Sequence, residues 1–514
     1  MDVVSGRRLT WAELDREADL VARGLNAMGL VAGYRVVIAM VNRVELVATY
    51  LGALRAGLVA VPVNPRSATG ELVRLLADCG ARVLVADTST LTTARQAVSG
   101  LEDALAAADD ELRRTTAVPR IVVVSALPLP GETSYEQLLS VAGTEAPVTV
   151  DAERLAVLLY TSGTSGRPRA AMLSHRALLA NVEQVAAIRP PLMTRDDVVL
   201  GVLPLFHVYG LNAVLGQVLR QQARLVLVDG FDVEGSLAVT EDEAVTVLPI
   251  APPVFGYWRE MPDLRDRLAG VRLVVSGSAP LPREPVRAFT ERTGIEVHQG
   301  YGLTEAAPVV TSTLCSNRGV AELTALGSVG AALPGVELRV TDDAGLAPEG
   351  EDTGEVQVRG ANLFSGYWPD GTGGPDRQGW FATGDVGFVD DEGDLFLVDR
   401  LKEVVIVSGF NVYPSEVEDV VAEVDGVAEV AVIGTSDPRT GEAVAAYVRP
   451  AAGSSYDAEE LVERVREHCA ARLARFKRPA EVHVVDVLPY TATGQVAKGR
   501  LRDARRHITP GLLE

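Results

Sequence analysis

Short apolar runs alternate with amphipathic helical patterns along the first part of the chain. Apolar residues recur at helical spacing after Thr10, and Glu13 completes a capping-box pattern, so the sequence predicts a helix ending near Gly29. The predicted strands that follow are Val36–Met40, Leu58–Val61 and Val83–Ala86, and the predicted helices between them are Val44–Arg55 and Ala68–Cys79. This alternation predicts a parallel sheet covered by helices.

A second series of strand patterns follows further along the chain. It comprises Leu225–Val228, Val245–Pro249, Val271–Ser276 and Ile295–Gln299. Each run leads into turn-forming residues, and ligands of α/β sheets usually bind at the carboxyl ends of such strands. Residues 88–118 are rich in Ala, Thr and Asp, and we expect them to form a surface excursion.

The pattern changes near residue 400, after a stretch rich in Gly and Asp. The predicted strands beyond it are Val404–Val407, Ala428–Gly434, Ala443–Val448 and Val482–Val485, with helices near Pro414–Val424 and Ala458–Leu473. This pattern is typical of a compact α+β module. The predicted fold is therefore α/β: a large multi-subdomain N-terminal region of helix-covered sheets, residues 1–399, and a small α+β C-terminal domain, residues 400–514, with a hinge near Lys402.

Composition and charge narrow the function classes. The net charge of −21 argues against sequence-independent binding of nucleic acid and against attraction to anionic membranes. The three cysteines are widely separated, which suggests neither a disulfide framework nor a Cys-rich metal site. The chain begins without a signal-sequence pattern, and no apolar run reaches the roughly 18 residues of a membrane span. We therefore expect a cytoplasmic protein without a transmembrane segment.

The run Thr161–Gly166 combines hydroxyl side chains with glycines directly after an apolar strand pattern. Such a loop can turn backbone N–H groups and hydroxyls toward an anion, which favours a phosphate-binding loop. The alternative is a flexible linker between a strand and the helix that begins near Ser174. A Walker loop fits poorly, because Gly166 is followed by Arg-Pro-Arg rather than by Lys and then Ser or Thr.

Seven motifs, spread over nearly the whole chain, resemble those of the adenylate-forming superfamily in the same order. They are YTSGTSGRPR (160–169), PLFHVYG (204–210), VSGSAPL (275–281), GYGLTE (300–305), FATGD (381–385), DRLKEVVIVSGFNVYPSEVE (399–418) and TATGQVAKG (491–499). This superfamily contains acyl-CoA synthetases such as fatty-acid–CoA ligases, peptide-synthetase adenylation domains and luciferases. Its members join a carboxylate to the α-phosphate of ATP, release pyrophosphate and pass the acyl group from AMP to a thiol.

The resemblance implies ATP, Mg²⁺ and coenzyme A as cofactors. The residues it assigns to the phosphates are Thr161, Ser162, Gly163, Thr164, Ser165, Gly166 and Arg169. Thr161 and Glu305 would contact the α-phosphate and Mg²⁺, a hard cation that prefers oxygen ligands. Because the attacking carboxylate is already anionic, the chemistry needs charge stabilisation rather than a protein nucleophile.

The resemblance also assigns residues to the nucleoside. The segments that would frame adenine contain Gly277, Ser278, Ala279, Gly300, Tyr301, Gly302 and Thr304, with Tyr301 stacking on the base. Asp385 would accept both ribose hydroxyls, and Arg400 would donate to the ribose. Taken alone, an Asp in a Thr-Gly-Asp sequence is ordinarily a turn residue.

Further roles concern the acyl group and the thiol. His207 would border the acyl carboxylate and gate pantetheine entry, whereas a lone His between apolar residues is more often packed or exposed. The C-terminal domain is implied to be mobile about Lys402, so that Gly409 and Phe410 line the thiol tunnel after it rotates. The alternative for Lys402 is an exposed charge at a strand edge.

The substrate is expected to be an apolar carboxylic acid. The PLFHVYG motif and the apolar residues 211–219 resemble fatty-acyl ligases, and Ala251–Trp258 contains no cation for a second carboxylate. We expect a medium- or long-chain fatty acid to be activated as acyl-AMP and transferred to CoA. A carrier protein as the acceptor is left open, as is oligomerisation.

Two positions depart from the family pattern. Arg169 stands where relatives usually have Lys, and Arg also binds phosphate. Gln495 stands where relatives carry the lysine that bridges the α-phosphate and the carboxylate, and Lys498 is an alternative source of that charge. Without such a charge, the chain would be a nucleotide- or acyl-adenylate-binding protein with impaired adenylation, acting as a sensor or partner subunit.

Overall fold

The chain divides into two compact units. The computed structural model describes residues 1–107, 116–141, 151–161, 169–259, 261–279, 281, 283–342, 353–400, 403–407, 410–437, 440–454, 456–473, 475–490 and 496–506. The first unit is formed by Met1–Ser162, Pro168–Glu337 and Arg359–Phe381, and the second includes Leu338–Val358 and Ala382–Glu514. The division of the chain near residue 400 remains a prediction.

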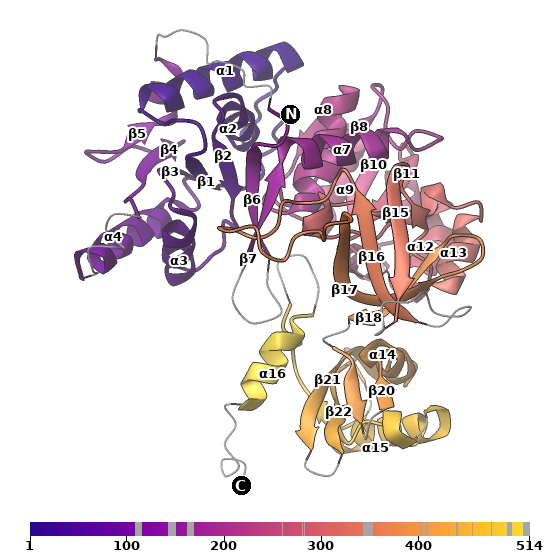
Figure 1. Cartoon of the computed structure of the whole chain (residues 1–514). Helices are drawn as coiled ribbons and strands as arrows, with labels where there is room; N and C mark the ends of the chain where they lie inside the picture. Colours follow the sequence, from indigo (N-terminus) through magenta and orange to yellow (C-terminus); the bar gives the residue numbers. More distant parts are fainter. Residues whose placement is uncertain are drawn as a thin grey trace. The chain divides into compact units, whose positions relative to one another are not determined.

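The first unit begins with a seven-stranded sheet in the order β5-β4-β3-β1-β2-β6-β7 (Figure 1). Its strands are β1 (Arg35–Ala39), β2 (Val59–Pro62), β3 (Val83–Asp87), β4 (Arg120–Val124), β5 (Thr133–Ser134), β6 (Leu155–Thr161) and β7 (Arg169–Ser174). All neighbours are parallel except β6 and β7, which form an antiparallel pair. The predicted parallel sheet is confirmed.

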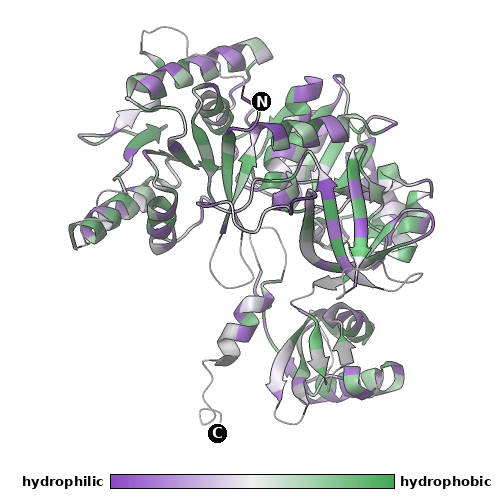
Figure 2. Ribbon diagram, in the orientation of Figure 1, coloured by the Kyte–Doolittle hydropathy of each residue, from purple (hydrophilic) through white to green (hydrophobic). Residues whose placement is uncertain are grey.

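Helices cover both faces of this sheet. They are α1 (Trp11–Ala27), α2 (Val44–Arg55), α3 (Thr69–Cys79), α4 (Leu91–Ala107), α6 (Tyr135–Leu139) and α7 (His175–Ala186). The predicted start of α1 is confirmed, since the side chain of Thr10 accepts from the backbone N–H of Glu13 and the Glu13 side chain accepts from that of Thr10. Figure 2 shows hydrophobic strands between helices of mixed polarity, which is the pattern of a buried sheet.

Helix α4 corrects the expectation of a surface excursion at residues 88–118. Three of its apolar residues, Leu91, Ala94 and Leu101, are buried against the sheet and α3. The Ala- and Thr-rich composition hid this helix because alanine is a strong helix former whose small side chain gives a weak hydrophobic signal.

A second, entirely parallel sheet of the first unit has the order β12-β11-β10-β8-β9. Its strands are β8 (Val198–Gly201), β9 (Arg224–Leu227), β10 (Val247–Ile250), β11 (Leu273–Ser276) and β12 (Val297–Gln299). The helical segments beside it are η1 (Tyr209–Gly216), α8 (Gln217–Gln221), α9 (Val233–Asp242), α10 (Pro253–Trp258), α11 (Leu264–Arg267) and α12 (Arg283–Thr293). Phe255 and Trp258 of α10 are fully buried in its core.

Most residues of the remaining sheets belong to the second unit. Strands β15 (Val336–Thr341), β16 (Gly354–Gly360), β17 (Trp380–Val389) and β18 (Leu395–Arg400) form one sheet in that order. A further sheet contains β19 (Val405–Val407), β20 (Phe410–Val412), β21 (Val427–Asp437), β22 (Gly441–Pro450) and β23 (Glu481–Val484). Helices α14 (Pro414–Ala422) and α15 (Ala458–Arg472) pack on the latter, which confirms the predicted α+β module, and α16 (Lys498–Arg506) follows.

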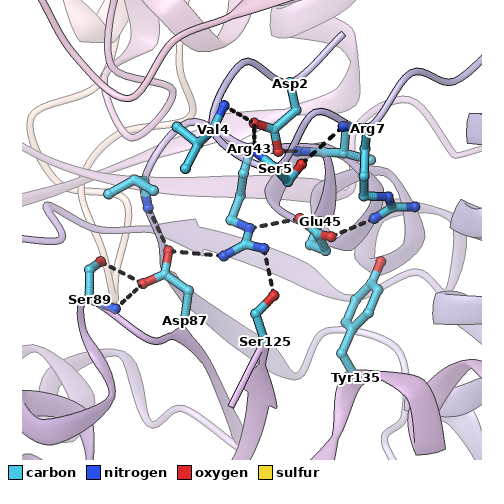
Figure 3. Close-up of polar contacts among 12 residues, drawn as sticks. Asp2, Val4, Ser5, Arg7, Arg43, Glu45, Asp87, Ser89, Ser125 and Tyr135 are labelled. Carbon is cyan, nitrogen blue, oxygen red and sulfur yellow. Dashed lines mark hydrogen bonds and ion pairs between the residues drawn. The ribbon is translucent and has the colours of Figure 1, made fainter.

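A buried ionic network closes the carboxyl edge of the first sheet (Figure 3). The Arg43 guanidinium donates to Glu45 Oε2 at 2.7 Å and to Ser125 Oγ at 2.8 Å, and lies 3.8 Å from Asp87 Oδ2. Arg7 Nη1 donates to Glu45 Oε1 at 2.5 Å. Burial alone would raise the pKa of Glu45, but the hydrogen bonds and charges of the two arginines outweigh it and lower that pKa. Arg43 therefore pairs with two buried carboxylates, Glu45 and Asp87, and Arg7 shares the first of them.

None of the described helices is both long and apolar enough to cross a membrane.

The replacement Arg43→Met tests how much this ionic network contributes to the free energy of unfolding. It leaves Glu45 and Asp87, whose side chains are 7% and 1% exposed, without their shared cation. We expect the free energy of unfolding to fall by about 3–5 kcal/mol, measured by urea denaturation. The control is Arg220→Met, which breaks the exposed Arg220–Glu183 pair. Equal effects of the two replacements would contradict the assignment.

Candidate active site

The carboxyl ends of the second sheet bring several predicted residues together. Ser276, the last residue of β11, is paired with Gln299, the last residue of β12. Gly277 and Gly300 follow directly on these neighbouring strands, so the VSGSAPL and GYGLTE motifs leave the sheet side by side. Strand β8 ends at Gly201 and leads into the PLFHVYG motif at the same edge. This edge is where ligands bind in open parallel sheets.

Gly277 is a point of close approach within this edge. A Cβ atom there would lie 3.3 Å from the ring of Tyr209. Ser278, which follows, adopts a left-handed conformation with φ of 74°. Ser276 is 2% exposed, and its buried hydroxyl has no hydrogen-bond partner among the described residues. A tight backbone segment and a buried hydroxyl of this kind fit the implied contact with a nucleobase.

The GYGLTE segment folds into a narrow hairpin-like turn. A Cβ atom on Gly300 would lie 2.4 Å from Thr311 O, and one on Gly302 would lie 2.4 Å from Pro308 O, so glycine is required at both positions. Leu303 N donates to Pro308 O at 3.0 Å. Thr304 and Glu305 begin the short helix η2 (Thr304–Ala306).

Three buried asparagines hold the backbone of this turn. Asn362 Nδ2 donates to Ala306 O at 2.7 Å, and Asn212 Nδ2 donates to Ala307 O at 2.6 Å. Asn181 donates to Val309 O at 2.7 Å, and its own carbonyl accepts from Val309 N at 3.1 Å. Irregular backbone buried without such partners would be costly. The position of Glu305 is therefore set by side chains from distant parts of the sequence.

A fourth asparagine holds the segment that leads to His207. Asn42 donates to Gly201 O at 3.1 Å and to Leu203 O at 2.9 Å, while its carbonyl accepts from Leu205 N at 2.9 Å. Asn42 is buried, with 6% of its surface exposed. The loop before His207 is thus fixed to the end of β1, across the two sheets of the first unit.

His207 is an uncharged hydrogen-bonding group. Its Nδ1 lies 3.3 Å from the backbone N of Tyr209, which donates to it, and this assigns the ring proton to Nε2. Burial lowers the pKa of His207 to about 4, so the imidazole is neutral at pH 7. A neutral imidazole with an Nε2–H can donate to a carboxylate, as its implied role requires.

Strands β6 and β7 flank the predicted phosphate loop. Thr161 and Arg169 are cross-strand partners, and Thr161 Oγ1 donates to Arg169 O at 3.2 Å. Of the predicted loop, Ser162, Gly163, Thr164, Ser165 and Gly166 lie outside the described residues. Its two ends are therefore held by the β6–β7 pair.

Tyr367, which the sequence analysis did not single out, joins Arg169 to Glu305. The Arg169 guanidinium lies 3.6 Å from the centroid of the Tyr367 ring. The Tyr367 hydroxyl donates to Glu305 Oε1 at 2.6 Å. The only sequence signal was an aromatic pair inside the Gly-rich stretch SGYWPDGTGG, residues 365–374. The structure thus joins Arg169 to Glu305 through a residue outside the predicted set, while Thr161 contacts Arg169 directly.

The other predicted residues lie in the second unit. Asp385 on β17 and Arg400 on β18 are paired across antiparallel strands, and their assignment to the ribose stays a prediction. Phe410 is the first residue of β20. Lys402, Gly409 and Gln495 lie outside the described residues, as do the side chains of Arg400 and Phe410.

Lys498 begins α16 and is held by two carboxylates of the second unit. Its Nζ lies 2.8 Å from Glu418 Oε1 and 3.2 Å from Glu403 Oε2. Its side chain is 14% exposed.

The described residues contain no group of three or more His, Cys, Asp or Glu side chains that could hold a metal by themselves. Mg²⁺ keeps several waters and commonly uses only one or two carboxylates together with substrate phosphates. Glu305 accepts one hydrogen bond, from Tyr367, and a carboxylate has several lone-pair sites. The Glu305 carboxylate can therefore serve as a single protein ligand to a Mg²⁺ ion whose other ligands come from nucleotide phosphates and water.

Comparisons with known proteins agree with this geometry. Residues 2–368 match the family described as AMP-binding enzyme, and residues 416–495 match the AMP-binding enzyme C-terminal domain. A feruloyl-CoA synthase of Amycolatopsis sp is 35% identical, over 97% of this chain and 94% of its own length. A long-chain-fatty-acid–CoA ligase of Bacillus subtilis is 31% identical, over 96% and 90%.

A solved structure extends the likeness to the fold. ATP-bound MatB from Rhodopseudomonas palustris is 32% identical and superposes with a TM-score of 0.86, covering 99% of this chain and 95% of its own. Both family domains are present in order and the likeness runs nearly end to end. The chain therefore belongs to the AMP-binding enzyme family, the adenylate-forming enzymes that its seven motifs resemble.

Proposed function

We propose that this enzyme is an ATP-dependent acid–CoA ligase. It activates an apolar monocarboxylic acid as the acyl-adenylate, releases pyrophosphate and transfers the acyl group to CoA in the cytoplasm. The observation that carries the proposal is the linkage of Thr161 and Arg169, which flank the Ser/Gly-rich loop, to the Glu305 carboxylate through Tyr367. These contacts place a hydroxyl and a cation at the two ends of the loop, with a carboxylate beside the tyrosine on which the cation stacks.

Each of these groups has a role in adenylate formation. Arg169 and the loop ends would hold the departing phosphates, and His207 Nε2–H would orient the attacking carboxylate. Mg²⁺, bound by Glu305 and the nucleotide, would offset the negative charge that gathers on phosphorus. The backbone from Gly277 to Ala279 and the Tyr301 ring would fix adenine, while Asp385 and Arg400 would bind the ribose.

The acid is proposed to have an apolar body, with a medium- or long-chain fatty acid as the leading candidate. The segment Ala251–Trp258 has no cation to pair with a second carboxylate, and Val254 and Phe255 are buried in the core. His207 is neutral, so it too offers no positive charge to a second carboxylate. Aromatic acids are the rival class, since relatives include a feruloyl-CoA synthase.

The second candidate function is a nucleotide- or acyl-adenylate-binding protein with slow adenylation. It is favoured by Gln495 at the position of the family lysine. Lys498 would have to leave Glu403 and Glu418 to supply the missing charge, and breaking two ion pairs of a largely buried side chain is costly. The two ion pairs of Lys498 therefore favour slow adenylation over the alternative that Lys498 replaces the family lysine.

The two functions are separated by measuring each half-reaction with a panel of acids. Pyrophosphate exchange reports adenylation, and mass spectrometry reports the CoA thioester. We expect exchange and thioester formation with octanoate, decanoate or a cinnamic acid and neither with malonate. Exchange without a thioester would redirect the proposal to a carrier-protein acceptor. ATP binding without exchange for every acid would contradict the ligase and favour the binding protein.

Two replacements test which residue supplies positive charge to the α-phosphate during adenylation. Gln495→Lys should raise acid-dependent pyrophosphate exchange by about 10²-fold or more, because single preorganised donors at charge-developing sites are worth roughly 2.7–4 kcal/mol. Thioester formation from supplied acyl-AMP should hardly change. If Lys498 supplies the charge instead, Gln495→Lys gains little and Lys498→Ala abolishes exchange. Exchange rates within about twofold of wild type for both variants would mean that the 491–498 segment is not catalytic.

A further inference from the structure

Tyr367 occupies a position between two charged groups that the proposed function needs. Its ring faces the Arg169 guanidinium, 3.6 Å from the ring centroid, and its hydroxyl donates to Glu305 Oε1 at 2.6 Å. Among the described residues, no ion pair joins Arg169 to Glu305. The Tyr367 side chain thus contacts both charged groups at once, the guanidinium with its ring and the carboxylate with its hydroxyl.

The backbone of Tyr367 is fixed on both sides. Tyr367 N donates to Thr372 O at 3.0 Å, and Gly371 N donates to Tyr367 O at 2.8 Å. Tyr367 also forms a bridge with Ala171 of β7, the strand that begins with Arg169. The ring is therefore carried by the same sheet edge as the guanidinium on which it stacks.

The side chain is enclosed by its own loop. Gly373 has a φ of +70°, and a Cβ atom there would lie 3.1 Å from the Tyr367 ring and 3.2 Å from Arg169 Nη2. On another side, the ring of Phe364 meets that of Tyr367 edge-on, with centroids 5.0 Å apart. The residue at 373 has no side chain, and this lets the backbone close over the stack.

The hydroxyl is a permanent donor. Burial raises the pKa of Tyr367, the charge and hydrogen bond of Glu305 raise it further, and the opposing effect of Arg169 is smaller. A phenol is protonated at neutral pH even without this shift, so the hydroxyl can hold the carboxylate from one side as a donor.

We propose that Tyr367 is a positioning residue for adenylation: its hydroxyl orients the Glu305 carboxylate and its ring holds the Arg169 guanidinium apart from it. This inference rests on the proposed function. The carboxylate stays directed for a cation and the guanidinium for phosphate, because neither is spent on the other. Tyr367 itself touches neither the acid nor the phosphorus.

The test is ATP binding by calorimetry, without any acid, so that no turnover occurs. Each variant is measured with MgCl₂ and with EDTA. Tyr367→Phe keeps the ring and loses only the hydroxyl, so the gain in ATP affinity that Mg²⁺ provides should fall about tenfold or more while the metal-free affinity is unchanged. Tyr367→Leu also removes the cation–π contact, so the metal-free affinity should fall as well.

Two controls separate positioning from packing. Tyr135→Phe removes a comparable Tyr–Glu hydrogen bond, from Tyr135 to Glu17 Oε1 at 3.0 Å, and should leave ATP binding unchanged. Adding Tyr367→Phe to Glu305→Gln should cause no further loss, because the hydroxyl acts through that carboxylate. Melting midpoints without nucleotide should match wild type for Tyr367→Phe.

The outcomes are distinguishable. An unchanged Mg²⁺-dependent gain in Tyr367→Phe, or additive losses in the double variant, would overturn the positioning role and leave the proposed function standing. A wild-type protein whose ATP binding is indifferent to Mg²⁺ would overturn both. A lowered melting midpoint of Tyr367→Phe with an intact Mg²⁺-dependent gain would make Tyr367 a packing residue only.

Discussion

The site depends on one constraint: irregular backbone that is buried must have its hydrogen bonds supplied by side chains. The turn at residues 301–310 and the loop at 202–205 belong to no named strand or long helix, yet most of their residues are buried or half-buried. Four buried asparagines meet this requirement, because one amide side chain both donates and accepts. Asn42, Asn181, Asn212 and Asn362 each bind carbonyls remote in sequence, and two of them also receive a backbone N–H.

In the proposed function, these fixed loops carry groups that would act on the substrates. The turn presents Glu305 toward Tyr367, and the loop presents His207 with its proton on Nε2. Preorganised groups of this kind cost no reorganisation when charge develops in the transition state. The same logic explains Tyr367, which gives a carboxylate and a guanidinium separate partners instead of letting them pair. A nucleotide would therefore bind to groups that are already oriented.

Much of the fold could be predicted from local sequence patterns, whereas contacts between residues distant in sequence could not. The capping box of Thr10 and Glu13, the parallel strands and the α+β module follow from signals within a few residues, and the structure confirms them. Helix α4 was missed because its small residues gave a weak apolar pattern. Tyr367 and the asparagines were missed because their partners lie far away in sequence, as with Tyr367 and Glu305, which are 62 residues apart. The motifs identified the candidate functional groups but not the residues, Tyr367 and the buried asparagines, that fix their positions.

The most direct test of this account is hydrogen exchange of wild type and Asn212→Leu, followed by mass spectrometry. The replacement removes the donor to Ala307 O and Leu178 O while keeping a side chain of similar size. The account predicts that amides of residues 301–310 exchange at least tenfold faster, since one buried hydrogen bond governs local opening, while the strands β10 and β11 keep their protection. Unchanged exchange in residues 301–310, or equal acceleration throughout the first unit, would contradict it.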